Sequence, residues 1–99
     1  MELDVENLDV IHNKAEQRFE VWIENSLSKL DYIRDGNTMV MTHVGVPFEL
    51  RNRGIAGRIT QAGLDYAKEN SLRVVPMCSY VAAYIRRHPQ YNRLIKQNE

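Results

Sequence analysis

The order of sequence patterns predicts an α/β (α+β) fold: an antiparallel meander of four strands followed by a helix, a fifth strand and a further helix. The first half alternates polar and apolar residues with the period of a strand, whereas the second half spaces its apolar residues as an amphipathic helix does. Asp35-Gly36-Asn37 lies between two alternating segments, and Gly and Asn tolerate the positive φ of a tight hairpin turn. With 99 residues the chain has room for one domain, which we expect to span residues 1–99, with 1–9 partly flexible.

The four strands of the meander follow from alternation alone. We expect them at residues 10–13, 18–24, 27–34 and 38–46. In the last of these, strict alternation puts one set of side chains on one face (Met39, Met41, His43) and a second set on the other (Val40, Thr42, Val44). Pro47 ends this strand because proline cannot donate to a sheet.

The second half contains three helical segments and one strand. A helix is expected from Gly54 to about Asn70, and residues 72–76 form a short apolar strand suited to the interior of a sheet. Ser79 is predicted to cap a second helix over residues 80–87. Pro89 suits the first turn of a third helix, which runs through Leu94.

Composition argues against polyionic partners. Thirteen basic residues balance thirteen acidic ones, so we expect no binding to nucleic acid or to a membrane surface. Cys78 is the only cysteine, so no internal disulfide can form, which fits a reducing compartment. The sequence has neither a signal-peptide pattern nor an apolar run of spanning length. We therefore expect a cytoplasmic protein that is a monomer or a weak dimer.

The most informative stretch is Val46–Arg58, in which a strand enters, a helix leaves, and small residues lie at the junction. The first N–H groups of a helix have no partner within it, so they and the helix dipole favour a bound anion. Gly54, Ala56 and Gly57 would let a pyrophosphate approach the backbone, and nearby arginines would add charged contacts. The alternative is a glycine-assisted helix start with solvated arginines, and the local sequence does not decide between the two.

The same stretch resembles a known family. Arg51-Asn52-Arg53-Gly54-Ile55-Ala56 is similar to the Gln/Arg-x-x-Gly-x-Gly/Ala signature with which GNAT N-acetyltransferases hold the pyrophosphate of coenzyme A. From about Val10 to Ile95 the chain also resembles the small single-domain GNAT-like proteins of the YjdJ type. Their typical tail, Pro-x-Cys-Ser-Tyr-Val followed by Tyr-Ile-x-Arg-His-Pro-x-Tyr, is matched here by residues 76–81 and 84–91.

This resemblance implies a compact GNAT-like fold and acetyl-CoA, or coenzyme A, as cosubstrate. The residues it implies for cosubstrate binding are Val46, Arg51, Asn52, Arg53, Gly54, Ile55, Ala56, Gly57 and Arg58. It also implies that the fourth strand parts from the fifth at residues 43–46, with the thioester arm lying in the gap.

The chain departs from the family pattern at two places. Val44 and Gly45 stand where the family often has Thr and Glu, which removes a carboxylate that could act as general base. Asn52 stands where glycine is common, although Asn tolerates left-handed φ better than most residues.

Three residues are candidates for catalysis: Cys78, His43 and Tyr80. Cys78 precedes a helix, where a thiol can be activated, and the family match favours a reactive thiol over the alternative of an inert buried one. His43 could be a general base or orient the cysteine, or be a structural histidine at a strand edge. The resemblance implies that the Tyr80 hydroxyl protonates the leaving thiolate; otherwise its ring packs on the sheet. The histidines and the cysteine lack a metal-ligand spacing, so we expect no metal.

The expected function is that of an N-acetyltransferase that moves acetyl from acetyl-CoA to an unidentified amine. The alternative is a non-catalytic or self-acetylating acyl-CoA-binding module, favoured by the small size of the chain and by Gly45. A third possibility, a domain that contacts nucleic acid through its arginines, is disfavoured by the neutral charge and by the lack of an aromatic and basic sheet face.

Overall fold

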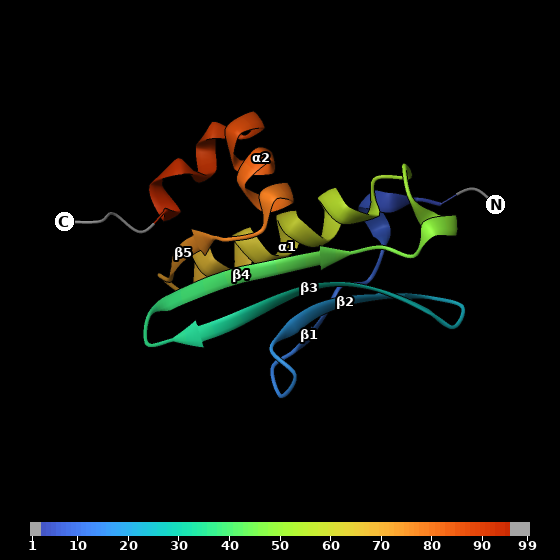
Figure 1. Cartoon of the computed structure of the whole chain (residues 1–99), viewed down its shortest axis with the longest axis horizontal. Coiled ribbons are helices and arrows are strands. Elements are labelled where there is room, and N and C mark those ends of the chain that lie inside the picture. The colour runs from blue at the N-terminus through green and yellow to red at the C-terminus, as the bar shows by residue number, and fades with distance from the viewer. Residues whose placement is uncertain (1–2, 96–99) are drawn as a thin grey trace.

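A five-stranded sheet forms one layer of the computed structural model, which describes residues 3–95 (Figure 1). Its strand order is β1-β2-β3-β4-β5, and the first four strands are antiparallel neighbours in chain order. β5 joins the edge of β4 in parallel. The strands are β1 (Ile11–Asn13), β2 (Arg18–Ile23), β3 (Ser26–Asp35), β4 (Thr38–Gly45) and β5 (Arg73–Pro76). The predicted meander and its fifth strand are confirmed.

The helices form a second layer (Figure 1). α1 (Ile55–Glu69) connects β4 to β5, and α2 (Ser79–Arg87) follows β5. At Gly63, α1 comes so close to the sheet that an added Cβ would lie 3.4 Å from the side chain of Met41 and 3.6 Å from Phe19. Residues 3–95 also contain three 3₁₀ turns: η1 (Val5–Asn7), η2 (Phe48–Leu50) and η3 (Pro89–Leu94).

α2 and η3 lie beside α1. The side chains of Tyr80 and Tyr84 approach Gly57 at the start of α1, and the Tyr91 hydroxyl of η3 donates a hydrogen bond of 2.7 Å to Asp65 of α1. The predicted third helix is thus present as a 3₁₀ helix with the predicted bounds. Of the predicted flexible stretch, residues 1–2 lie outside the described residues, and η1 forms part of the rest.

The prediction that Ser79 caps α2 is wrong. Cys78 is the N-cap residue and Ser79 is the first residue of the helix, with no side-chain hydrogen bond at the cap. The Cys78 N–H donates to the carbonyl of Met41 at 3.0 Å, so Cys78 still belongs to the extended chain that continues β5. The sheet, and not the serine, therefore sets where α2 begins.

A β-bulge in β4 corrects the predicted facing of its last residues. Tyr32 pairs with Met41 but Asp31 pairs with His43, which leaves Thr42 as the extra residue. Because directly paired residues share a face, Val44 lies on the same face as Met41, and it packs against the core. His43 instead lies on the opposite face with Asp31, and it is exposed.

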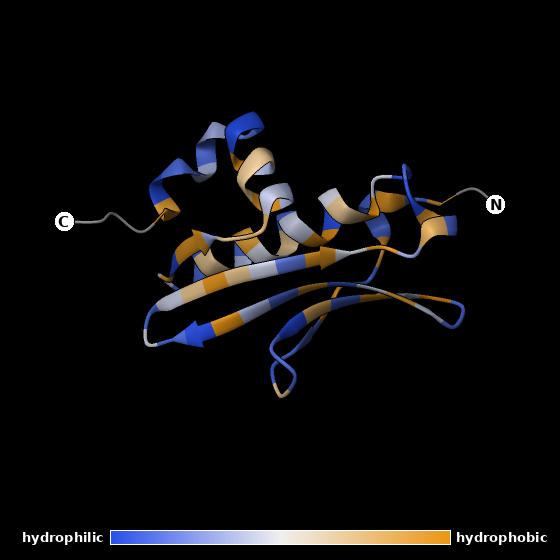
Figure 2. Cartoon of the chain, viewed as in Figure 1, coloured by the Kyte–Doolittle hydropathy of each residue, from blue (hydrophilic) through white to orange (hydrophobic). Residues whose placement is uncertain are grey.

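The two faces of the sheet differ in character, and Figure 2 shows hydrophobic and hydrophilic residues alternating along the strands. The face toward α1 supplies the core, which includes Phe19, Leu30 and Met41. On the other face Trp22 and Ile33 are 50% and 57% exposed. A groove opens beside the last residues of β4, beyond the part of this strand that pairs with β5.

Candidate functional site

β4 and β5 pair only along part of their length. Their register runs from Thr38 opposite Arg73 to Met41 opposite Pro76, and β4 then continues to Gly45 without β5. The chain after β5 turns away into α2, so a gap opens beside the last residues of β4. The predicted parting of these strands is confirmed.

A groove of about 470 Å³ occupies this gap. One wall is the end of β4 with the residue after it, residues 43–46, and another is the first turn of α1, residues 55–57. The loop between them contributes Leu50, Arg51, Asn52 and Gly54, and Tyr80 of α2 closes the remaining side.

The loop before α1 turns sharply because two of its residues adopt left-handed backbone. Asn52 has φ +63° and Gly54, the N-cap of α1, has φ +85°. The first intrahelical bond runs from the Arg58 N–H to the Gly54 carbonyl at 3.1 Å. Helix geometry therefore leaves the N–H groups of residues 55–57 without intrahelical partners, beside the groove that those residues line. An anion at this end of the groove would meet those donors and the positive end of the dipole.

Arg51 adds a positive charge to this end of the groove. Its Nε donates to the carbonyl of Val46 at 3.1 Å, and its guanidinium lies 5.8 Å from the centre of the Phe48 ring. The hydrogen bond ties the loop back to the end of β4. Arg51 is thus both a groove residue and a brace for the loop.

Two other predicted cosubstrate residues lie outside the groove lining. Arg58 points along the other side of α1, where its Nη2 donates to the Leu8 carbonyl at 3.4 Å and it lines a second hollow with Glu6, Gln61 and Asp65. Arg53 follows Asn52 but does not line the groove within the described residues. The remaining predicted cosubstrate residues, Val46, Arg51, Asn52 and 54–57, line it.

His43 and Tyr80 lie on different walls of the groove. The His43 ring folds over Gly45: a Cβ added to Gly45 would lie only 3.1 Å from His43 Nε2. The Tyr80 hydroxyl lies 3.4 Å from where a Cβ on Gly57 would be. A base beside the end of β4 and a hydroxyl beside the first turn of α1 therefore both line the groove.

Cys78 does not line the groove within the described part of the chain. It is half-buried at the start of α2 and packs against the hydrophobic core, with its backbone bonded to Met41. These surroundings favour the alternative of an inert, buried thiol over a reactive one. In sequence, Cys78 is two residues from Tyr80 of the groove. Its chemical role stays a prediction.

The residues predicted for cosubstrate binding and catalysis leave out three that line the groove: Val44, Gly45 and Leu50. Leu50 was not among the predicted cosubstrate residues, but η2 turns it inward and it is buried. The signal was present: Pro47 is the N-cap of this turn, and Leu50 is the apolar residue three positions later. Val44 and Gly45 were predicted only as departures from the family pattern and as part of the gap at residues 43–46, and the facing of Val44 depends on the bulge at Thr42.

Comparison with known proteins agrees with this geometry. A model of the GCN5-related N-acetyl-transferase family matches residues 18–94. The chain belongs to this family. The match includes β2 to η3 and the whole groove.

Curated relatives of this family member include the protein NATD1 of several vertebrates. The zebrafish protein (Danio rerio) is 29% identical over 90 residues, covering 85% of this chain and 81% of that protein. The mouse protein (Mus musculus) is 30% identical over 83 residues, covering 81% and 76%. The solution structure of a GCN5-like protein from Staphylococcus aureus superposes with a TM-score of 0.72 at 25% identity, covering 94% of this chain and 92% of that one.

These likenesses establish the GNAT-like fold and the acetyltransferase family of the chain. None of the helices in residues 3–95 combines the length and the apolar character needed to cross a membrane.

Proposed function

We propose that the groove binds acetyl-CoA and that the domain transfers its acetyl group to an amine. The observation that carries this proposal is the gap between β4 and β5. The groove in this gap is also lined by the first turn of α1, whose N–H groups have no intrahelical partners. The gap suits an extended acyl arm, and the turn suits a pyrophosphate.

The residues present fit this cosubstrate. Residues 54–57 and Arg51 would hold the pyrophosphate through backbone N–H groups and one guanidinium. Small side chains at Gly54, Ala56 and Gly57 leave the backbone accessible to it. Bound acetyl-CoA supplies an activated thioester, so the protein needs only to position an amine and to move protons.

His43 and Tyr80 are the proposed proton carriers. An imidazole at the groove wall can accept the proton that an attacking amine loses. The phenol of Tyr80, on another wall, can protonate the departing thiolate of coenzyme A. A role of Cys78 in catalysis is supported by the family resemblance alone, because its side chain packs against the core and is not part of the groove lining in residues 3–95.

The second candidate is an acyl-CoA-binding module that does not turn over an external amine. Gly45 favours it, because the family often has a Glu at this position that could act as base. The His43 ring occupies the space over Gly45, so an imidazole stands near where the Glu side chain would lie and could act as the base instead. This arrangement favours catalysis over binding alone.

The test measures thermal stability with coenzyme A and acetyl-CoA. Ligand at about one hundred times its dissociation constant should stabilise the fold by about 2.7 kcal/mol. Ala56→Glu places a carboxylate in the pyrophosphate site while remaining compatible with the first turn of a helix, so it should abolish the shift. Gln61→Glu adds the same charge on the exposed side of α1 and should keep it. An unchanged melting temperature of the wild-type protein at millimolar ligand concentration would refute the proposal.

A further inference from the structure

Lys29 lies on the strand next to the groove wall. In the sheet register Lys29 of β3 is directly opposite Gly45 of β4, and Asp31 is directly opposite His43. Paired residues share a face, so Lys29, Asp31 and His43 all lie on the face away from α1. β4 is the strand between Lys29 and the groove. Adjacent strands are about 4.8 Å apart, so Lys29 lies about one strand spacing from the strand that forms the groove wall.

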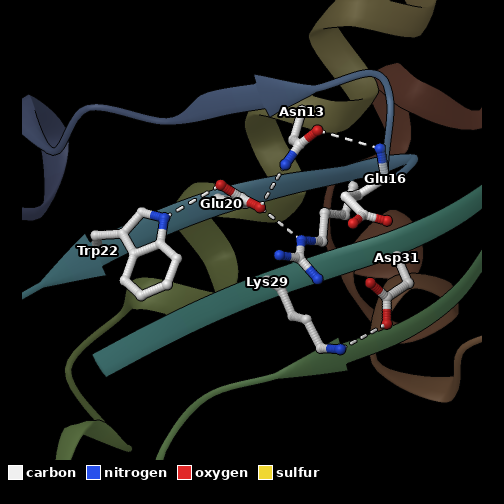
Figure 3. Close-up of polar contacts among 7 residues, drawn as sticks. Asn13, Glu16, Glu20, Trp22, Lys29 and Asp31 are labelled. Atoms are coloured by element: carbon white, nitrogen blue, oxygen red, sulfur yellow. Dashed lines mark hydrogen bonds and ion pairs between the residues drawn. The ribbon is translucent and has the colours of Figure 1, made fainter. Parts of the chain in front are cut away.

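The Lys29 side chain bends toward the His43 end of β4. Its Nζ lies 3.2 Å from a carboxylate oxygen of Asp31, two residues further along β3 (Figure 3). Because Asp31 pairs with His43, this contact draws the Lys29 ammonium along the sheet toward His43 and away from the loop before α1, which is the part proposed to hold the pyrophosphate. The side chains of Lys29 and Asp31 are 34% and 30% exposed, so the ion pair is weak and the ammonium is free to exchange.

Gly45 has no side chain between Lys29 and the groove. Gly45 lines the groove, and the His43 ring occupies the space where a side chain at this position would lie, so on the shared face the imidazole lies between Lys29 and the groove. The other described lysines are placed differently. Lys14 lies over the Tyr66 ring at 5.9 Å, and Lys68 is exposed in the last turn of α1.

From this placement we infer that Lys29 is a built-in acetyl acceptor, and that the domain acetylates it in cis when acetyl-CoA occupies the groove. The inference rests on the proposed function. It names a modification site on β3, distinct from Cys78, which faces the core at the start of α2.

The step balances without any further reactant. After the Lys29 ammonium releases one proton to solvent, the amine attacks the acetyl carbonyl carbon, a C–N bond forms, and the C–S bond to coenzyme A breaks. The amine loses one proton, for which His43 on the same face is the proposed base, and the departing thiolate gains one, for which Tyr80 of the groove lining is the proposed acid. The product is a neutral amide at Lys29, so the Asp31 carboxylate loses the cation that it now holds.

The test is tandem mass spectrometry of the wild-type protein incubated with acetyl-CoA at pH 8. Acetylation at Lys29 should be at least about ten times faster than at Lys14 or Lys68, because a positioned amine reacts as if at high local concentration. Its rate should not depend on protein concentration. Excess coenzyme A should suppress the Lys29 adduct and leave the slow adducts at Lys14 and Lys68 unchanged.

Two variants sharpen the test. Lys29→Arg keeps the charge beside Asp31 and should remove the fast adduct, while the matched Lys68→Arg should keep it. Equal rates at all three lysines, or a Lys29 rate that rises with protein concentration, would overturn acetylation in cis. The thermal shift with coenzyme A separates the two proposals: if it persists while Lys29 stays unmodified, the inference fails and the proposed function stands.

Discussion

At the scale of single residues, backbone conformation in the loop before α1 decides the shape of the groove. Asn52 and Gly54 both have left-handed φ, and the family resemblance of this stretch implies that glycine would be expected at position 52. Left-handed backbone costs an L-residue about 1–2 kcal/mol. The cost is smaller for Asn than for most residues, because its short side chain can hydrogen-bond to the nearby backbone. The departure at Asn52 is therefore a tolerated replacement of glycine.

Substitutions at Asn52 test this explanation. Asn52→Ala should lower the free energy of unfolding by about 1 kcal/mol, because alanine lacks the local hydrogen bonding that helps Asn adopt left-handed φ. Asn52→Gly should stay close to the wild type. Urea denaturation measures both, with the exposed Glu49→Ala as a neutral control. Equal losses for Ala and Gly would show that the Asn52 side chain, and not its backbone, matters.

Gly45 positions the His43 ring by having no side chain. A Cβ on Gly45 would lie 3.1 Å from His43 Nε2, so Gly45→Ala should displace the imidazole. If His43 is the base, acetyl transfer should fall about ten-fold or more. In a His43→Ala background the same change should have little further effect, since the ring it displaces is absent. A full additional loss in that background would mean that Gly45 acts on the groove directly. Steady-state kinetics with a primary amine provides the measurement.

At the scale of elements, the strands and α1 were predictable because their signals are local. The turn at Gly36, which has φ +58°, depends on neighbouring residues, and the apolar stripe of α1 depends on the spacing of residues within one short segment. The bulge at Thr42 was not predictable, because it depends on how β3 pairs with β4. It moved His43 and Val44 to faces opposite to those that alternation predicts.

The part of the groove made by the loop and the first turn of α1 was predictable because those residues are contiguous in sequence, whereas its assignment as a cosubstrate site and the gap beside β4 came from the family resemblance. What could not be predicted was which way Arg53, Arg58 and Cys78 lie. Arg58 turns to the Leu8 carbonyl, and Cys78 is fixed by Met41. Both contacts join segments far apart in the chain, which no local pattern reports.

One such contact attaches η3 to α1. The Tyr91 hydroxyl donates to the Asp65 carboxylate at 2.7 Å, and burial together with this hydrogen bond raises the pKa of Tyr91. Tyr91→Phe should lower the free energy of unfolding by about 1.5–3 kcal/mol, the usual contribution of a bond to a charged group. Asp65→Asn keeps an acceptor and should cost less. A loss below experimental error for Tyr91→Phe in urea denaturation would mean that apolar packing alone holds η3.

At the scale of the whole molecule, an aromatic cluster joins the edge strand β1 to the rest of the fold. The His12 ring stacks on Phe19 at 4.1 Å and meets the Tyr66 ring of α1 edge-on at 4.4 Å. His12 Nε2 and the Tyr32 hydroxyl are hydrogen-bonded at 2.6 Å. One imidazole thus contacts β2, β3 and α1 together.

This position makes stability depend on pH. Burial, and secondly the charge of Lys14, lower the pKa of His12 below its ordinary value. In the window between the lowered folded value and about 6.5, the unfolded chain binds more protons than the folded one, so stability falls as pH falls. A second decline belongs to Glu20 at more acidic pH. Its pKa is lowered mainly by the hydrogen bond from Arg18, so its contribution is lost as pH falls below the ordinary range of a carboxyl.

The two declines can be separated by replacing His12. His12→Gln cannot titrate but can still hydrogen-bond to Tyr32, so between pH 7 and 5 its free energy of unfolding should decrease less steeply than that of the wild type. The difference in slope cannot exceed about 1.4 kcal/mol per pH unit, the limit for one group. Both proteins should retain the later decline due to Glu20. Comparison at pH 8, where an ordinary histidine is neutral, isolates the loss of ring packing on Phe19 and Tyr66. Parallel pH profiles from urea denaturation would contradict this role, because the wild type would then lose nothing by protonating an imidazole at the junction of β1, the sheet and α1.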